Sequence, residues 1–176
     1  MISSYTPDAT AFSTGLLVTR LILGGLIAAH GAQKLLGWFG GHGLAGTGGF
    51  FESLGFRPGR LFATVAASIE VVSGLLVVLG LFGPVGPALM VSVMIVAAVS
   101  VHLKNGVFAS ANGIELPLLY VAGAITLALT GHGLFSLDAL FGMQAMWTPM
   151  LAGVALIIGI VGGFGNLAAR RPVQAA

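Results

Sequence analysis

The sequence predicts an all-α protein that crosses the membrane several times as a helical bundle. Of its 176 residues, 57% are hydrophobic and 7% are charged, whereas soluble domains carry about 25% charged residues. Five apolar runs can each cross a hydrocarbon core about 30 Å thick, which takes about 20 helical residues. Because the runs are hydrophobic throughout and do not alternate, they predict helices and not the strands of a membrane barrel.

The five predicted helices follow one another with short connections. They are Gly15–Leu36, Leu61–Phe82, Pro84–Val101, Leu116–Thr130 and Trp147–Gly165. We expect the first helix to be retained and not cleaved, because no basic residue precedes it and it is longer than a signal-peptide core. The fourth is short and stops at the glycines around His132, so we expect it to begin before Glu115. The connections leave no room for a soluble domain, and residues 1–176 are expected to form one transmembrane domain.

The connection Gly37–Arg60 is unusually apolar and rich in glycine. Thr47 is a suitable N-cap for a short helix, in which Phe50, Phe51 and Leu54 share one face. Such a helix can lie in the membrane interface. Two interpretations stay open, a loop packed against the end of the bundle and a lid over a ligand.

An odd number of helices places the two ends of the chain on opposite sides of the membrane. Six of the seven basic residues then fall on one side. They are Lys34, Arg57, Arg60, Lys104, Arg170 and Arg171. The positive-inside tendency makes that side cytoplasmic, with the C-terminus there and the N-terminus outside. The formal charge of +2 therefore reports orientation, and no nucleic-acid partner is expected because the chain lacks a basic stripe or an aromatic platform.

The chain contains no cysteine. This absence excludes disulfides, cysteine-ligated iron–sulfur clusters and a dithiol relay. No metal site is predicted, because no predicted helix carries an H-x-x-x-H pair or clustered carboxylates. We therefore expect any redox role to proceed without thiol or metal chemistry in this chain.

Charged side chains occur within two predicted helices, Arg20 in the first and Glu70 in the second. A charge at mid-helix costs about 2.5–3.5 kcal/mol on insertion, so both should face the bundle interior. At 100° per residue, one stripe of the first helix contains Arg20, Gly24, Ile27, Gly31 and Lys34. A stripe of mostly small residues on the second helix contains Ala63, Ala66, Ala67, Glu70, Ser73 and Gly74. Such stripes let helix backbones approach closely in lipid.

Glu70 is predicted to find its partner on the first helix. The helical rise puts Glu70 at a depth between His30 and Arg20, so either of them can reach it. Lys34 lies near the end of its helix, where it fits two roles, a member of this interior set and an anchor that snorkels to the interface.

A second polar cluster is predicted where the third helix ends and the fourth begins. His102 ends the third helix, Asn105 follows it, and Glu115 starts the fourth, where the helix dipole favours an acid. Together with the first two helices, this cluster forms a candidate ligand pocket. Its predicted members are Arg20, His30, Gln33, Lys34, Glu70, His102, Asn105 and Glu115. His132 stands alone beside glycines on the outer side and is interpreted as a loop residue.

Three interpretations of the polar set follow. The groups can be structural, since hydrogen bonds between membrane helices contribute about 1 kcal/mol or less each. They can instead line a pocket for a small molecule such as a quinone, because ligand sites are mostly apolar with a few convergent polar groups. Haem ligation by His30 and His102 is disfavoured, because their depths differ by about 9 Å or more.

The chain resembles the DoxX family of small membrane proteins. The resemblance is carried by LLVTRLILGGLIAAHGAQKLLGWFGGHGLAGTGGFFESLGF, IEVVSGLLVVLGLF, VHLKNGVFASANGIELPLLY and SLDALF. It implies a four-helix membrane core over residues 15–141, to which residues 147–166 add a fifth, C-terminal transmembrane helix. Besides the candidate pocket residues, Asp138 matches the family's polar pattern.

The resemblance also implies a function. The family is named after a membrane subunit of a thiosulfate:quinone oxidoreductase, and some members are associated with oxidant defence. We therefore expect a multi-pass protein of the bacterial cytoplasmic membrane that binds a quinone-like molecule and serves a redox process. Its expected partners are a redox protein, of which it would be a membrane subunit, or a second copy of the same chain. The alternative is a non-catalytic assembly or transport module in which the buried charges are structural.

Overall fold

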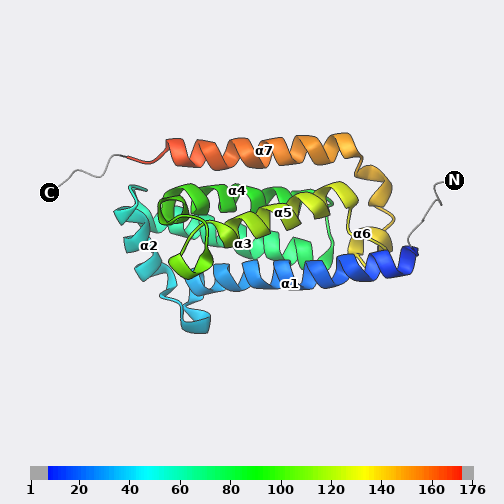
Figure 1. Cartoon of the computed structure of the whole chain (residues 1–176), viewed down its shortest axis with the longest axis horizontal. Coiled ribbons are helices and arrows are strands. Elements are labelled where there is room, and N and C mark those ends of the chain that lie inside the picture. The colour runs from blue at the N-terminus through cyan, green and yellow to red at the C-terminus, as the bar shows by residue number, and fades with distance from the viewer. Residues whose placement is uncertain (1–7, 172–176) are drawn as a thin grey trace.

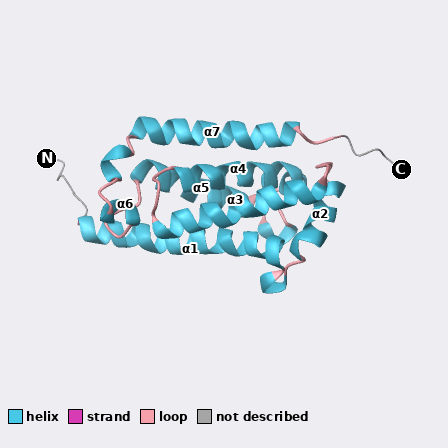
Figure 2. Cartoon of the chain, turned by 180° about the vertical axis from the view of Figure 1, so that it is seen from behind, coloured by secondary structure: helices cyan, strands magenta, loops and turns pink. Residues whose placement is uncertain are grey.

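The structure is a computed structural model that describes residues 8–171. The described residues contain helices and loops and no strands (Figures 1 and 2). Four helical segments are long and apolar enough to cross a membrane: α1 (Ala9–Leu36), α3 (Gly59–Leu79), α4 (Val85–Ala97) with its continuation to Asn105, and α7 (Pro149–Ala168). The apolar helix α5 (Glu115–Thr130) has 16 residues. The predicted all-α membrane bundle is confirmed.

The long helices lie roughly along a common direction. α1 packs against α3, α3 against α4, and α4 against both α5 and α7, so that α7 covers one side of the bundle (Figure 1). The short helix α2 (Gly43–Ser53) lies at one end and the single turn α6 (Leu137–Leu140) lies at the other. α1 begins at the α6 end and α7 finishes at the α2 end, so the described chain starts and ends at opposite ends of the bundle.

The stripe predicted on α1 is its buried face, except for Lys34, whose side chain is 31% exposed. Ser13, Leu16, Arg20, Gly24, Ile27 and Gly31 are its buried residues. The contact with α3 is made by backbone: a Cβ added at Gly74 would lie 2.5 Å from the carbonyl oxygen of Gly24, and one at Gly31 would lie 2.7 Å from that of Ala67. Glycine at these positions therefore lets the two helices approach closely, as small residues do in lipid.

α5 begins at Glu115, so the prediction that it begins earlier is wrong. The preceding residues form a compact loop that uses the first polar groups of the helix. The backbone N–H of Glu115 donates to Val107 O over 2.8 Å, and its carboxylate accepts from the N–H of Ala109 over 2.6 Å. Those bonds hold the loop in a turn, and the helix cannot continue through it.

The helix predicted within the first connection is present as α2, but Thr47 does not cap it. α2 begins at Gly43, and Thr47 is buried inside it, where its hydroxyl donates to Lys34 O over 3.4 Å. The glycine-rich turn after α1 starts the helix four residues before Thr47, which leaves this hydroxyl facing the end of α1. At the other end, Glu52 accepts from the N–H of Gly59 over 3.1 Å and so caps the first turn of α3.

The close approach of α1 and α3 makes a prediction about stability. Gly74→Ala should lower the free energy of unfolding by about 1–3 kcal/mol, because the new methyl group would overlap the backbone of α1. Gly25→Ala is the matched control, since nothing lies within 4 Å of a Cβ at that position. Titration of mixed micelles with dodecyl sulfate measures both values. Equal stabilities of the two variants would contradict the backbone contact.

Candidate functional site

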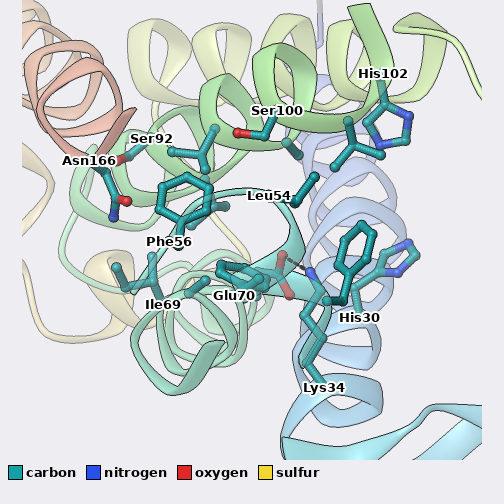
Figure 3. A pocket seen from close by; sticks show the side chains of 17 residues that line it. His30, Lys34, Leu54, Phe56, Ile69, Glu70, Ser92, Ser100, His102 and Asn166 are labelled. Carbon is teal, nitrogen blue, oxygen red and sulfur yellow. Dashed lines mark hydrogen bonds and ion pairs between the residues drawn. The ribbon is translucent and has the colours of Figure 1, made fainter. Parts of the chain in front are cut away.

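A cavity of about 260 Å³ opens among α1, α2, α3, α4 and α7 near the α2 end of the bundle (Figure 3). We call it the Glu70 cavity. Its lining residues are His30, Lys34, Phe50, Phe51, Leu54, Phe56, Ala66, Ile69, Glu70, Ser92, Val93, Val96, Ala97, Ser100, Val101, His102 and Asn166. This mixture, apolar with a few polar groups, is typical of sites for small molecules.

The first polar feature of this cavity is an ion pair between Lys34 and Glu70 (Figure 3). Glu70 is only 3% exposed, and its Oε1 accepts a hydrogen bond from Lys34 Nζ. The prediction that Arg20 or His30 pairs with Glu70 is therefore wrong. Arg20 is instead bonded to Val77 and Val78 further along α3, and the His30 ring lies against Tyr120. Lys34 is therefore the basic group of α1 that reaches Glu70.

Two buried oxygen atoms of this lining have no hydrogen-bond partner among residues 8–171. They are Glu70 Oε2 and Ser100 Oγ. Most buried polar atoms in proteins are paired, so two in one cavity mark places where a ligand can donate or accept. Ser100 belongs to a π-helical segment, Ala98–His102, that continues α4. Such segments are rare and occur frequently at functional sites.

The apolar part of the wall comes from α2 and the residues that follow it. Phe50, Phe51 and Leu54 all line the cavity, so the predicted shared face of this helix turns toward it. Phe56 is fully buried and stacks with Phe51 at a centroid distance of 5.5 Å. Asn166 of α7 completes the wall. The α2 segment is thus both packed against the bundle end and part of the ligand-sized space.

The structure brings four of the eight predicted pocket residues together. These are His30, Lys34, Glu70 and His102. His30 lies edge-on to Tyr120, with a centroid distance of 6.3 Å, and its Nδ1 is 3.2 Å from Gln33 Oε1. Ser100 and Asn166 were not predicted, because one serine or asparagine in an apolar helix has no sequence signal and only the helix packing turns it inward. Phe56 was not predicted either, since it lies in the turn between α2 and α3 and only the packing of that turn buries it.

The other predicted residues hold neighbouring backbone and do not line the cavity. Gln33 donates to Phe39 O over 3.1 Å, and Glu115 accepts from the Ala109 N–H. Asn105 donates to Val101 O and to Asn112 O, each over 3.1 Å. These bonds shape the turns at this end of the bundle.

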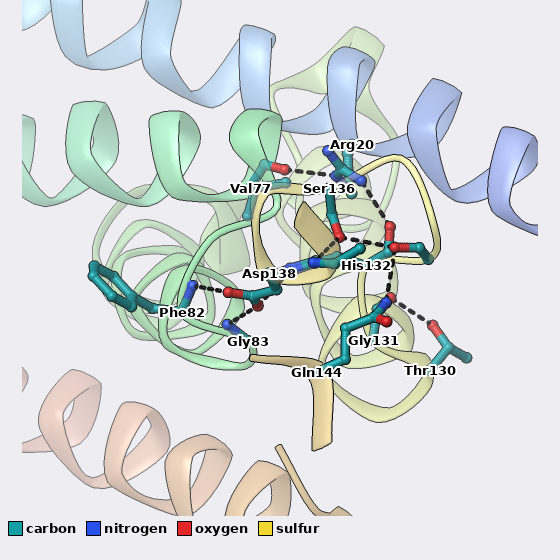
Figure 4. A network of polar contacts seen from close by, with 12 residues as sticks. Arg20, Val77, Phe82, Gly83, Thr130, Gly131, His132, Ser136, Asp138 and Gln144 are labelled. Carbon is teal, nitrogen blue, oxygen red and sulfur yellow. Dashed lines mark hydrogen bonds and ion pairs between the residues drawn. The ribbon is translucent and has the colours of Figure 1, made fainter. Parts of the chain in front are cut away.

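Arg20 lies in a separate cluster near the α6 end of the bundle (Figure 4). Its guanidinium is 1% exposed and donates to four carbonyl oxygens, with distances of 2.7–3.0 Å. Those oxygens belong to Val77, Val78, His132 and Phe135. Arg20 therefore ties the end of α3 to the loop after α5.

Asp138 is the acid of this cluster and is 2% exposed. It accepts from the N–H groups of Phe82 and Gly83 over 2.9 and 2.7 Å, and its Oδ2 lies 3.4 Å from His132 Nδ1 (Figure 4). His132 is therefore not the lone loop residue that its glycine neighbours suggested. The short turn around α6 carries Asp138 back to it, which sequence spacing does not reveal.

Burial lowers the pKa of His132 from its ordinary value, and the positive charge of Arg20 lowers it further. Asp138 and the carbonyl of Gly80 oppose this shift without cancelling it. The imidazole is therefore neutral at pH 7.

Removing the Arg20 guanidinium should destabilise the protein. Arg20→Met keeps much of the side-chain volume but leaves four buried carbonyls and Asp138 uncompensated, so we expect a loss of about 3–5 kcal/mol in the free energy of unfolding. Arg60→Met, at an exposed position, is the control and should change it by less than about 0.5 kcal/mol. Dodecyl sulfate titration measures both. A small effect of Arg20→Met would show that these carbonyls do not depend on the guanidinium.

Acid should weaken the fold through His132. Because its pKa is lower in the folded chain, the unfolded chain binds a proton there first, and the free energy of unfolding falls as the pH drops below about 6.5. Unfolding curves measured near pH 7.5 and near pH 5.5 should show this loss, which His132→Asn should reduce. The same loss in His132→Asn as in the original chain would assign the pH dependence to other groups.

The chain is similar to known proteins. The DoxX family profile matches residues 15–103. A curated protein of Bacillus subtilis (strain 168), named "Putative oxidoreductase CatD", is 34% identical over 128 residues, which cover 73% of this chain and 87% of that relative. No solved structure matches the chain. With this profile match and this relative, the chain belongs to the DoxX family of membrane proteins.

Proposed function

We propose that the Glu70 cavity binds a small amphipathic molecule of the quinone class and that the protein thereby serves a redox process in the membrane. The observation that carries the proposal is Glu70 Oε2, a buried carboxylate oxygen without a partner among the described residues, in a cavity of about 260 Å³. This volume suits a ring-sized group. The relative named as an oxidoreductase supports the redox assignment.

The chemistry of the walls fits a quinol head group. Phe50, Phe51 and Phe56 provide apolar surface for a ring, and Glu70 Oε2 can accept a hydrogen bond from a ring hydroxyl. Ser100 Oγ can donate to a second ring oxygen. Lys34 donates to Oε1 of Glu70, so Oε2 is the oxygen that is left for a ligand.

Proton exchange would involve His30, which lines the cavity and is exposed at the bundle surface. An imidazole nitrogen is a general acid or base that can pass a proton between a bound molecule and the surface. Because the chain has no cysteine, the electrons of the bound molecule would pass to a partner protein.

The α2 end of the bundle is proposed to face the cytoplasm. Arg170, near the end of the described chain, donates to Leu54 O over 2.9 Å and lies 5.5 Å above the Phe56 ring, and so shares this end with the first connection. With this orientation, the basic residues at the α2 end lie on the cytoplasmic side, in agreement with the positive-inside tendency.

The alternative function is a non-catalytic assembly or transport module. The observation that favours it is the Lys34–Glu70 pair itself, which links α1 to α3 and can be purely structural. In that case the double variant Lys34→Met/Glu70→Leu, which replaces both charges with apolar groups, should have a free energy of unfolding at least as large as that of the original chain. Its assembly or transport activity should also be unchanged.

Quinone binding provides the test of the proposal. Glu70→Gln keeps the side-chain volume and removes the negative acceptor, so we expect decylubiquinol to bind about 10- to 100-fold more weakly, as for a lost hydrogen bond to a charged group. The matched control is Glu115→Gln, a carboxylate at the same end of the bundle that does not line the cavity. Equilibrium dialysis of the purified protein in micelles measures both.

Two results would refute the proposal. One is the absence of saturable binding to the original chain. The other is equal affinity in the two variants, provided that both elute as folded protein.

A further inference from the structure

A second cavity, of about 190 Å³, is lined by Asp138 of α6 and therefore lies at the α6 end of the bundle, away from the Glu70 cavity. We call it the outer cavity. Its walls come from the turn after α3, the end of α5 with the segment that follows it, and the first residues of α7, and they include His132 and Trp147. Thr130, Gln144 and Pro149 are exposed lining residues and form its rim.

Two buried nitrogen atoms belong to the residues of this wall. His132 Nε2 and Trp147 Nε1 have no hydrogen-bond partner within the described part of the chain, residues 8–171. His132 is 3% exposed. Because an unpaired buried polar group costs about 1–3 kcal/mol, two of them in the wall of one small cavity point to a ligand that pairs with both.

The two nitrogens offer opposite hydrogen-bonding roles. His132 Nδ1 faces Asp138 Oδ2 at 3.4 Å (Figure 4), so we assign the imidazole proton to Nδ1, which leaves Nε2 as an acceptor. The lowered pKa of His132 agrees with a neutral ring. The indole Nε1–H of Trp147 is a donor only.

Gly83 holds both groups in position. Its N–H donates to Asp138 Oδ2 over 2.7 Å, which fixes the acid that orients His132. Its φ of 48° and its missing side chain let the Trp147 indole lie directly against the backbone, since a Cβ would come within 2.4 Å of the ring. The site is therefore preorganised by one backbone position.

The charges near the outer cavity are already compensated. Arg20 donates to four carbonyls, and Asp138 accepts from two backbone N–H groups and faces His132. Across residues 8–171 there is also no group of three or more His, Cys, Asp or Glu that could hold a metal ion. The walls are thus suited to a neutral molecule and not to an ion.

We propose that the outer cavity is a second ligand site, distinct from the Glu70 cavity, for a small uncharged molecule that carries a hydroxyl group. Such a hydroxyl carries a donor suited to His132 Nε2 and an acceptor suited to Trp147 Nε1–H. A hydroxyl is one of the few neutral groups that satisfies a donor and an acceptor with a single oxygen.

The fluorescence of Trp147 itself can report ligand binding in the outer cavity. The sequence has two tryptophans, so Trp38→Phe leaves Trp147 as the single emitter of the full chain in detergent micelles. Cyclohexanol should shift its emission in a saturable manner, whereas methylcyclohexane, of similar shape without the hydroxyl, should not. In this background His132→Asn, which can keep an N–H toward Asp138 but lacks Nε2, should weaken binding about 5- to 100-fold.

The control is His30→Gln in the same background, which alters a histidine of the Glu70 cavity and should leave the cyclohexanol titration unchanged. A linear response, an equal response to methylcyclohexane, or an unaltered affinity in His132→Asn would overturn the proposal. If His132→Asn does not fold, Trp147→Phe with ¹⁵N-labelled histidine replaces it. The Nε2 resonance of His132 should then shift when cyclohexanol is added to the original chain. In the Trp147→Phe variant, the same shift should need a higher cyclohexanol concentration. A Nε2 resonance that stays constant in the original chain would overturn the proposal.

Discussion

The backbone contact between α1 and α3 is the constraint on which the rest of the structure depends. Gly24 meets Gly74, and Gly31 meets Ala67, so closely that no side chain fits between the helices. In lipid, where the hydrophobic effect does not drive helices together, such packing supplies much of the association. It also sets the antiparallel register. That register places Arg20 beside Val77 and Val78 and brings Glu70 within reach of Lys34, so each polar cluster depends on it.

The two ends of the bundle compensate their buried charges in different ways. At the α6 end, Arg20 is held by backbone carbonyls, which cannot move without unfolding the turn, and the guanidinium therefore acts as a structural tie. At the α2 end, Glu70 is held by a lysine that is 31% exposed, and one of the two carboxylate oxygens of Glu70 is buried without a partner among residues 8–171. A charge with free hydrogen-bonding capacity in a low-dielectric wall is the arrangement that can respond to a ligand.

The apolar connection after α1 gives the Glu70 cavity its shape. α2 packs against α3 and turns Phe50 and Phe51 into the wall, while the π-helical continuation of α4 brings Ser100 to the opposite side. One short helix thus packs against the end of the bundle and also lines the Glu70 cavity, and the interpretation of this connection as a cover over a ligand stays a prediction. The contact of Arg170 with Leu54 ties the end of α7 to the same region.

The sequence by itself determined the membrane environment, the helical class, and the inward faces of α1 and α3. These predictions depend on local properties of the chain: the length of each hydrophobic run, the cost of a charge in lipid, and the 100° spacing of Arg20, Gly24 and Gly31. Such properties can be recognised without knowing which helices contact one another. Only the tertiary structure decided which groups meet. Pairing of Lys34 with Glu70 and of His132 with Asp138 depends on helix register and on the turn around α6, and neither leaves a periodic signal in the sequence.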